Sequence, residues 1–189
     1  MIKNTQERYG LIAILFHWIS ALIIFFMFGL GLYMMDLSYG HPYEQSSLSL
    51  HQSLGLSFFI LWTLRLIWKF MNPKPKLPKA DTSFKKFENF AAHAVHIILY
   101  LLMFTMLFSG YLLAITDGSG DYFTFWGLFE VPSIHEILEG HADRAGLVHE
   151  FVAWGLIALA GIHALAALKH HFIDKDETLK TMLPKKHKH

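Results

Sequence analysis

Four long segments of the chain contain no charged residue, and this feature constrains the fold more than any other. They comprise residues 9–35, 45–64, 89–116 and 151–168, and the second stays apolar to about residue 71. A helix needs about 20 apolar residues to cross the roughly 30 Å of hydrocarbon in a bilayer. The sequence therefore predicts an all-α integral membrane protein, a four-helix transmembrane bundle with helices over about residues 9–35, 48–71, 89–115 and 146–169.

The composition favours the same class. Hydrophobic residues make up 53% of the chain and charged residues only 16%, which is too apolar for an ordinary soluble domain of this size. The first segment is long and lacks a small-residue cleavage site at its end, which argues against a cleavable signal peptide. We see no internal repeat, so we expect one transmembrane domain over residues 1–189, surrounded by the lipid bilayer and without a nucleic-acid partner.

The positions of the charges predict how the helices are oriented. The N-terminus, the loop 65–88 and the C-terminal tail hold fifteen of the sixteen Lys and Arg residues. The segments 36–50 and 117–150 hold only Arg144, together with nine of the fifteen acidic residues. By the positive-inside rule, both termini are predicted to be cytoplasmic. The proline-rich segment 72–80 is expected to be a stiff connection, and the aromatic stretch DYFTFWGLFEVP of the external loop is expected to lie in the membrane interface.

Four histidines fall inside the predicted helices, at two matched depths. His17 and His163 each lie about two turns from the predicted cytoplasmic end of their helix, whereas His51 and His149 lie near predicted external ends. His149 and His163 are fourteen residues apart, which is about four helical turns, so they share one face at about 21 Å from each other. Two imidazoles at equal depth on facing helices are suited to hold the iron of a porphyrin between them.

A lone histidine inside a membrane helix does not by itself indicate a haem ligand. A hydrogen bond to a neighbouring helix or a proton relay accounts for one such residue equally well. Zinc requires three or four ligands at one depth, and copper usually recruits sulfur ligands. The chain has no cysteine, which also excludes disulfides, iron–sulfur clusters and covalent c-type haem attachment. The matched depths of four histidines therefore favour haem over these metals.

Further polar residues lie near the predicted cytoplasmic surface. His93 and His96 occupy the first turns of the third helix, as alternative ligands or as neighbours of a propionate, a quinone head group or a proton path. His170, followed by His171, lies at the membrane boundary and is interpreted as a neighbour of a propionate or a quinone. Arg65 either pairs with a propionate or extends to lipid phosphates.

Several stretches of the chain carry a family resemblance: RYGLIAILFHW, SLHQSLGL, AAHAVHIILYLL and, most specifically, VHEFVAWGLIALAGIHALAALKHHFIDKDETLKTMLP. Through them the chain resembles the bacterial cytochrome b561 family of four-helix dihaem membrane proteins over nearly its whole length. The resemblance implies two haem b groups in a multi-pass protein of the bacterial inner membrane. It implies that His17 and His163 are the axial ligands of the cytoplasmic haem iron, and that His51 and His149 are those of the external one.

An iron with two imidazole ligands has no open position, so it exchanges single electrons. We therefore expect a quinone-linked oxidoreductase that carries electrons between an external, periplasmic donor and ubiquinone or menaquinone. The resemblance includes superoxide oxidation coupled to ubiquinone reduction. The predicted external segments, however, hold eight more acidic than basic residues, which should repel an anion. The alternative is an electron-transfer subunit that docks a soluble redox protein, and a third hypothesis is a haem-free transporter or proton relay.

Overall fold

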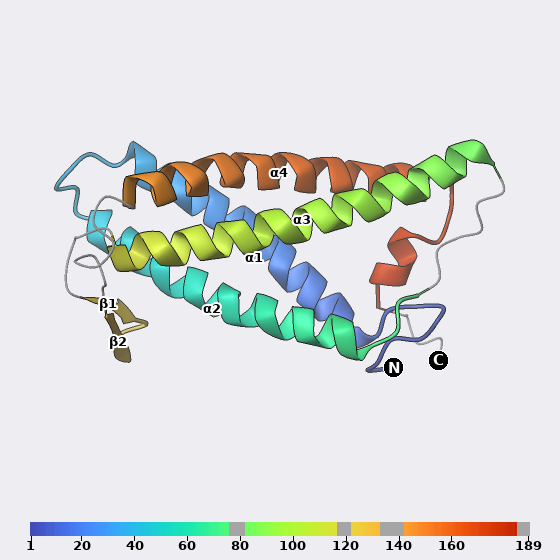
Figure 1. The fold of residues 1–189 in the computed structure, drawn as a ribbon, viewed down its shortest axis with the longest axis horizontal. Coiled ribbons are helices and arrows are strands. Elements are labelled where there is room, and N and C mark those ends of the chain that lie inside the picture. The colour runs from blue at the N-terminus through green and yellow to red at the C-terminus, as the bar shows by residue number, and fades with distance from the viewer. Residues whose placement is uncertain (76–81, 117–121, 133–141, 185–189) are drawn as a thin grey trace. The chain divides into compact units, whose positions relative to one another are not determined.

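The computed structural model describes residues 1–75, 82–116, 122–132 and 142–184. The elements, in chain order, are helices α1 (Leu11–Asp36), α2 (Glu44–Met71) and α3 (Ser83–Thr116), strands β1 (Tyr122–Phe125) and β2 (Phe129–Pro132), helix α4 (Ala142–Phe172) and the short 3-10 helix η1 (Leu179–Met182) (Figure 1). All four α-helices are long and apolar enough to cross a membrane, which confirms the predicted class.

The apolar side chains of these helices face outward far more often than inward. In the most apolar window of each helix, at most 11% of the residues are buried within the protein. Large side chains such as Phe26, Leu101 and Leu165 are exposed. A helix that is apolar on all sides and uncovered by protein is stable where lipid surrounds it.

Helices α2, α3 and α4 begin four to six residues before their predicted starts, because polar first turns join the helices. At the start of α3, the hydroxyl of Thr82 accepts a hydrogen bond of 3.2 Å from the backbone N–H of Lys85. This is the bond of a helix N-cap, which satisfies a backbone donor that the helix itself leaves unpaired. The charge-free segments therefore indicate where a span enters lipid and not where its helix begins.

Strands β1 and β2 form an antiparallel hairpin within the segment that was expected to be an aromatic interfacial loop. Phe125 lies opposite Phe129, and the turn between the strands contains Trp126 and Gly127, both with positive φ angles (48° and 72°). The hairpin is fixed to α2, because the backbone N–H of Trp126 donates to Ser53 Oγ at 3.1 Å and its indole N–H donates to Ser57 Oγ at 2.9 Å. Two hydrogen bonds thus hold a bulky residue in a backbone conformation that it rarely adopts.

The chain divides into two compact units, each of which contains segments of all four long helices. Unit 1 comprises residues 1–21, 61–99 and 158–189, and unit 2 comprises residues 22–60 and 100–157. Ile14, Ser20 and Trp62 are buried in unit 1, whereas Phe58, Met103, Leu107 and Leu156 are buried in unit 2.

Within unit 1, the segment after α4 returns to the start of α1. The indole N–H of Trp18 donates to the carbonyl of Met182 at 2.8 Å, and the Arg8 guanidinium donates to the carbonyl of Lys180 at 2.5 Å. Helix η1 is therefore held beside the residue that follows His17 in the sequence.

Candidate functional site

Two imidazoles face each other in the described part of unit 2. The rings of His51 on α2 and His149 on α4 have their centres 6.1 Å apart, with an angle of 72° between their planes. Both histidines are half-buried. Nδ1 of His51 is buried and has no hydrogen-bond partner among the described residues. A buried, unsatisfied ring nitrogen is typical of a site built for a ligand.

Helix α3 forms a close seat for His149. Ser109 Oγ lies 3.3 Å from His149 Nδ1, and the Ser109 hydroxyl donates to the carbonyl of Met106 at 3.1 Å. Since the hydroxyl proton is directed to that carbonyl, the serine oxygen can accept a hydrogen bond from Nδ1–H. A Cβ added to Gly110 would lie 2.7 Å from His149 Cε1, so only glycine leaves room for the ring. We call His51, Ser109, Gly110 and His149 the His51 cluster.

Unit 1 contains a second cluster, to which each long helix contributes one residue. The rings of His17 on α1 and His163 on α4 have their centres 6.3 Å apart, with an angle of 76° between their planes. Arg65 on α2 places Nη2 3.3 Å from His17 Nδ1. His96 on α3 lies with its ring centre 5.0 Å from that of His163. These four residues are the His17 cluster.

The structure separates the remaining residues that the sequence singled out. His96 belongs to the His17 cluster, and its Nδ1–H donates to the carbonyl of Ala92 at 2.7 Å. His93, one turn earlier on α3, is exposed. His170 lies in the last turn of α4 in an ion-pair network, where Nδ1 is 2.8 Å from Asp174 and 3.1 Å from Asp176.

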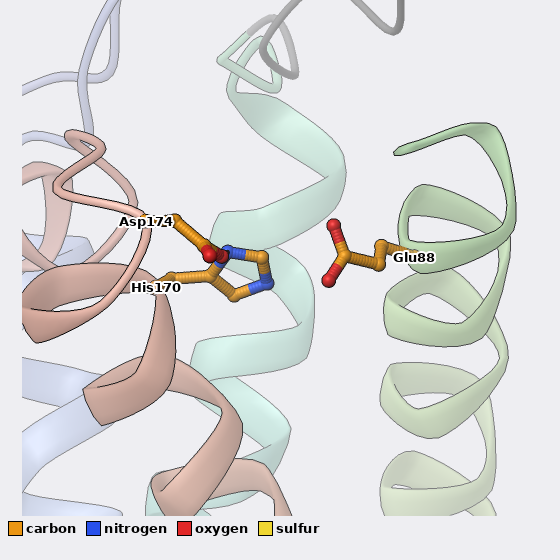
Figure 2. A group of neighbouring side chains, drawn as sticks. All are labelled: Glu88, His170 and Asp174. Atoms are coloured by element: carbon orange, nitrogen blue, oxygen red, sulfur yellow. The ribbon is translucent and has the colours of Figure 1, made fainter. Parts of the chain in front are cut away.

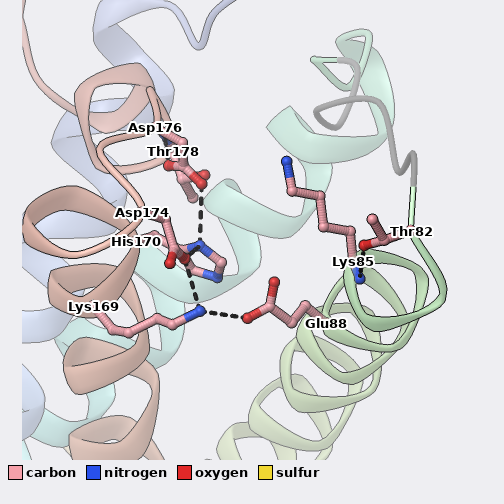
Figure 3. Close-up of polar contacts among 8 residues, drawn as sticks. All are labelled: Thr82, Lys85, Glu88, Lys169, His170, Asp174, Asp176 and Thr178. Carbon is pink, nitrogen blue, oxygen red and sulfur yellow. Dashed lines mark hydrogen bonds and ion pairs between the residues drawn. The ribbon is translucent and has the colours of Figure 1, made fainter.

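Three side chains of this network have the composition of a small metal site. The ligand atoms of Glu88, His170 and Asp174 all lie within 4.8 Å of one another (Figure 2). Lys169, however, places Nζ 2.5 Å from Glu88 and 2.7 Å from Asp174 (Figure 3). The ammonium group already supplies the positive charge between the two carboxylates, so we interpret the group as an ion-pair network that joins α3 to the end of α4.

The network continues into the segment after α4. Burial raises the pKa of the Asp176 carboxyl, but hydrogen bonds from Thr178 and the neighbouring His170 together lower it below its usual value. A carboxyl group with a lowered pKa stabilises the folded state above its unfolded pKa, and this contribution is lost as the pH falls through the folded pKa. The contacts that hold the segment after α4 are therefore stable at neutral pH and are weakened by acid.

The sequence did not identify Ser109 or Gly110 as members of a site. Serine and glycine inside an apolar segment are commonly explained by close helix packing, and their role depends on which side chain of another helix faces them. Two glycines of α1 behave differently: a Cβ at Gly31 would make an ordinary contact of 3.8 Å with His51, and one at Gly29 would meet no described atom within 4 Å.

The four apolar helices present imidazoles that face one another in pairs. Helix bundles commonly hold a cofactor between side chains arranged in this way. The chain matches the family model described as "Prokaryotic cytochrome b561" over residues 8–185. The chain therefore belongs to the prokaryotic cytochrome b561 family, and this membership implies a b-type haem and electron transfer at the membrane.

Individual relatives cover nearly the whole chain. Cytochrome b561 homolog 2 of Escherichia coli (strain K12) is 42% identical over 183 residues, which are 96% of this chain and 94% of that protein. A protein of Yersinia pestis named "Probable superoxide oxidase CybB" is 28% identical over 184 residues, 96% of this chain and 98% of its own. Cytochrome b561 homolog 1 of Escherichia coli (strain K12) is 27% identical over 185 residues, with 96% and 99% covered.

Substitution of Gly110 by alanine should disturb the seat of His149. The new Cβ would overlap the ring, so we expect a loss of about 1–3 kcal/mol of stability from overpacking and a lower haem content. Haem per chain by the pyridine haemochrome assay and thermal denaturation in detergent measure both effects. Gly155→Ala on α4 is the control, because its Cβ would meet no described atom within 4 Å. Equal haem content and stability in the two variants would contradict the close packing of the His149 ring against Gly110.

Substitution of Lys169 by glutamine should weaken the attachment of α3 to the end of α4. We expect a lower thermal midpoint in detergent, because Glu88 and Asp174 lose the cation between them. The difference from the unchanged protein should shrink as NaCl is raised, since salt screens charges near the surface. Lys175→Gln, just beyond α4, is the matched control. A salt-independent effect, or one equal to that of the control, would argue against the network.

Proposed function

We propose that the chain is a dihaem b-type cytochrome that carries single electrons between an external donor and the membrane quinone pool. In this proposal His17 and His163 hold one haem iron, and His51 and His149 hold the other. A b-type haem bound between two imidazoles supplies reversible one-electron exchange. The rest of the function lies in how the protein places and surrounds the two pairs.

The separation of the imidazole rings carries this proposal. Metal–imidazole bonds of about 2 Å, with about 1.2 Å more from nitrogen to ring centre, separate the centres of two ligand rings by about 6.4 Å. The observed separations are 6.3 Å for His17 and His163 and 6.1 Å for His51 and His149. His96 and His163, at 5.0 Å, are too close to hold an iron between them. The distances therefore favour His17 over His96 as the partner of His163.

The hydrogen bonds of His149 suit a ligand that binds through Nε2. A neutral imidazole that donates from Nδ1 keeps its lone pair on Nε2, and metal-binding histidines usually have such an outer partner. Ser109 Oγ, 3.3 Å from Nδ1, is that partner in the His51 cluster. The backbone of Met106 is a second hydrogen-bond partner of His149, and the two acceptors together suit a ring that donates from Nδ1.

His17 requires an exchange of partners when it binds iron. A guanidinium group only donates, so in the contact with Arg65 it is His17 Nδ1 that accepts and Nε2 that carries the proton. Ligation through Nε2 moves the proton to Nδ1 and ends this hydrogen bond. The Arg65 charge then remains beside the site, where a haem propionate is a suitable partner.

The charges of the two units support an orientation in the bacterial inner membrane. The residues of unit 1 include fifteen of the sixteen Lys and Arg residues and both ends of the chain. By the positive-inside rule, unit 1 is on the cytoplasmic side and the His51 cluster is on the periplasmic side. Ubiquinone or menaquinone is the proposed acceptor. His93, His96 and His170 are the proposed proton-handling or propionate neighbours.

Two electron donors are consistent with this arrangement. Superoxide is favoured by the relative named as a probable superoxide oxidase. A soluble redox protein with a basic docking face is favoured by unit 2, which holds nine of the fifteen acidic residues and a single arginine. Such a surface repels an anion on average and attracts a cationic partner.

Ligand variants test the haem assignment. His17→Ala or His163→Ala should remove one haem per chain, and His51→Ala or His149→Ala should remove the other. The pyridine haemochrome assay and the reduced absorption spectrum measure both number and identity. His93→Ala, on an exposed position of α3, is the control and should retain two haems. Loss of a haem in this control, together with two haems in His17→Ala, would overturn the assignment.

Stopped-flow spectroscopy distinguishes the two donors. If superoxide is the donor, mixing it with the oxidised protein should reduce the haems faster than superoxide dismutates in buffer, and added quinone should reoxidise them. Superoxide pre-treated with superoxide dismutase is the control. Haem reduction no greater than in this control would exclude superoxide and favour the docked redox protein.

A further inference from the structure

The two clusters lie in units with opposite charge. The residues of unit 1 include six of the fifteen acidic residues against fifteen basic ones, whereas those of unit 2 include nine acidic residues and only Arg144. A positive surrounding potential favours the reduced form of an iron centre, because reduction removes positive charge. A negative potential favours the oxidised form.

At close range, the His17 cluster contains a cation. Arg65 places its guanidinium 3.3 Å from the His17 ring and also interacts electrostatically with His163 and His96. Lys69, one turn further along α2, adds a second positive charge that acts on His96. Among the acidic residues of unit 1, Glu88 and Asp174 are paired with Lys169. Of the described charges, those of Arg65 and Lys69 therefore act on the His17 cluster, and a haem propionate that paired with Arg65 would offset part of the first.

The His51 cluster has a different neighbour at the same ring position. There Nδ1 of His149 faces the hydroxyl oxygen of Ser109, which is 5% exposed and directs its own proton to the Met106 carbonyl. An imidazole that donates from Nδ1 is a more basic ligand at Nε2 and stabilises the ferric state. The ligand of this site is thus made more electron-rich, while that of the other site lies beside a cation.

We propose that the two haems differ in reduction potential, with the higher potential at His17 and His163 and the lower at His51 and His149. Arg65 and Ser109 are the residues that set the difference. This inference rests on the haem binding proposed above. Electron transfer from the periplasmic to the cytoplasmic site is then downhill: one electron leaves a ferrous iron, which becomes ferric, and reduces a ferric iron to the ferrous state. No bond or proton changes at either iron.

The test is an anaerobic spectroelectrochemical titration of the haem-loaded protein in detergent, after its haem content has been measured. We expect two components in the unchanged protein. Arg65→Gln should lower the higher reduction potential and leave the lower reduction potential unchanged. Arg65→Lys keeps the charge, so both of its potentials should stay close to those of the unchanged protein. Ser109→Ala should raise only the lower reduction potential. Ser109→Thr keeps a hydroxyl at this position, so its lower potential should stay close to that of the unchanged protein.

The outcomes separate this inference from the function on which it rests. A protein that binds no haem would overturn both. Two haems with one shared potential, or with Arg65→Gln acting on the lower component, would overturn the inference and leave the dihaem function standing. Unshifted potentials in Arg65→Gln and Ser109→Ala, with two haems retained, would show that neither residue sets the difference.

Discussion

The structure depends on the hydrogen-bonding requirement of imidazoles placed inside apolar helices. Each ring has two nitrogens that need partners, and hydrocarbon supplies none. In the His51 cluster, one nitrogen of His149 is met by Ser109, and the missing side chain of Gly110 allows that approach. Nδ1 of His51 is buried and has no hydrogen-bond partner among the described residues, so the pair is incomplete without a ligand or a water molecule.

The two clusters share one helix and differ in what the other helices contribute. Helix α4 gives one histidine to each cluster, His149 in unit 2 and His163 in unit 1. The second histidine comes from α2 in one unit and from α1 in the other. Arg65 on α2 and Ser109 on α3 then supply different neighbours to the rings. Two pairs of facing imidazoles thus acquire different electrostatics from side chains outside each pair.

The sequence predicted the helices well because charge is so costly in lipid that charge-free segments report the spans directly. It also predicted which histidines come together, since the spacing of His149 and His163 depends only on helix periodicity and the matched depths depend only on the spans. The first residues of the helices were harder to predict, because polar residues such as Thr82 extend a helix beyond the apolar segment.

Features that depend on contacts between distant residues were not predictable from one sequence. The hairpin turn at Trp126 is stabilised by Ser53 and Ser57, which are about 70 positions away in the chain. Gly110 matters only because His149 faces it, and Lys169 matters because Glu88 lies across from it on α3. None of these pairs leaves a periodic or compositional signal, and each follows from the packing of one helix against another.

The charge distribution on which the proposed orientation rests also bears on the proposed direction of electron flow. Lys and Arg residues gathered in one unit favour its placement on the cytoplasmic side, and the same charges favour the reduced state of a haem there. Acidic residues in the other unit would favour the oxidised state of a haem at the His51 cluster. Reversing the charges would reverse both the orientation and the potential difference, so electrons would still move toward the basic side. In the proposed function, topology and the direction of transfer would therefore be coupled through the same side chains.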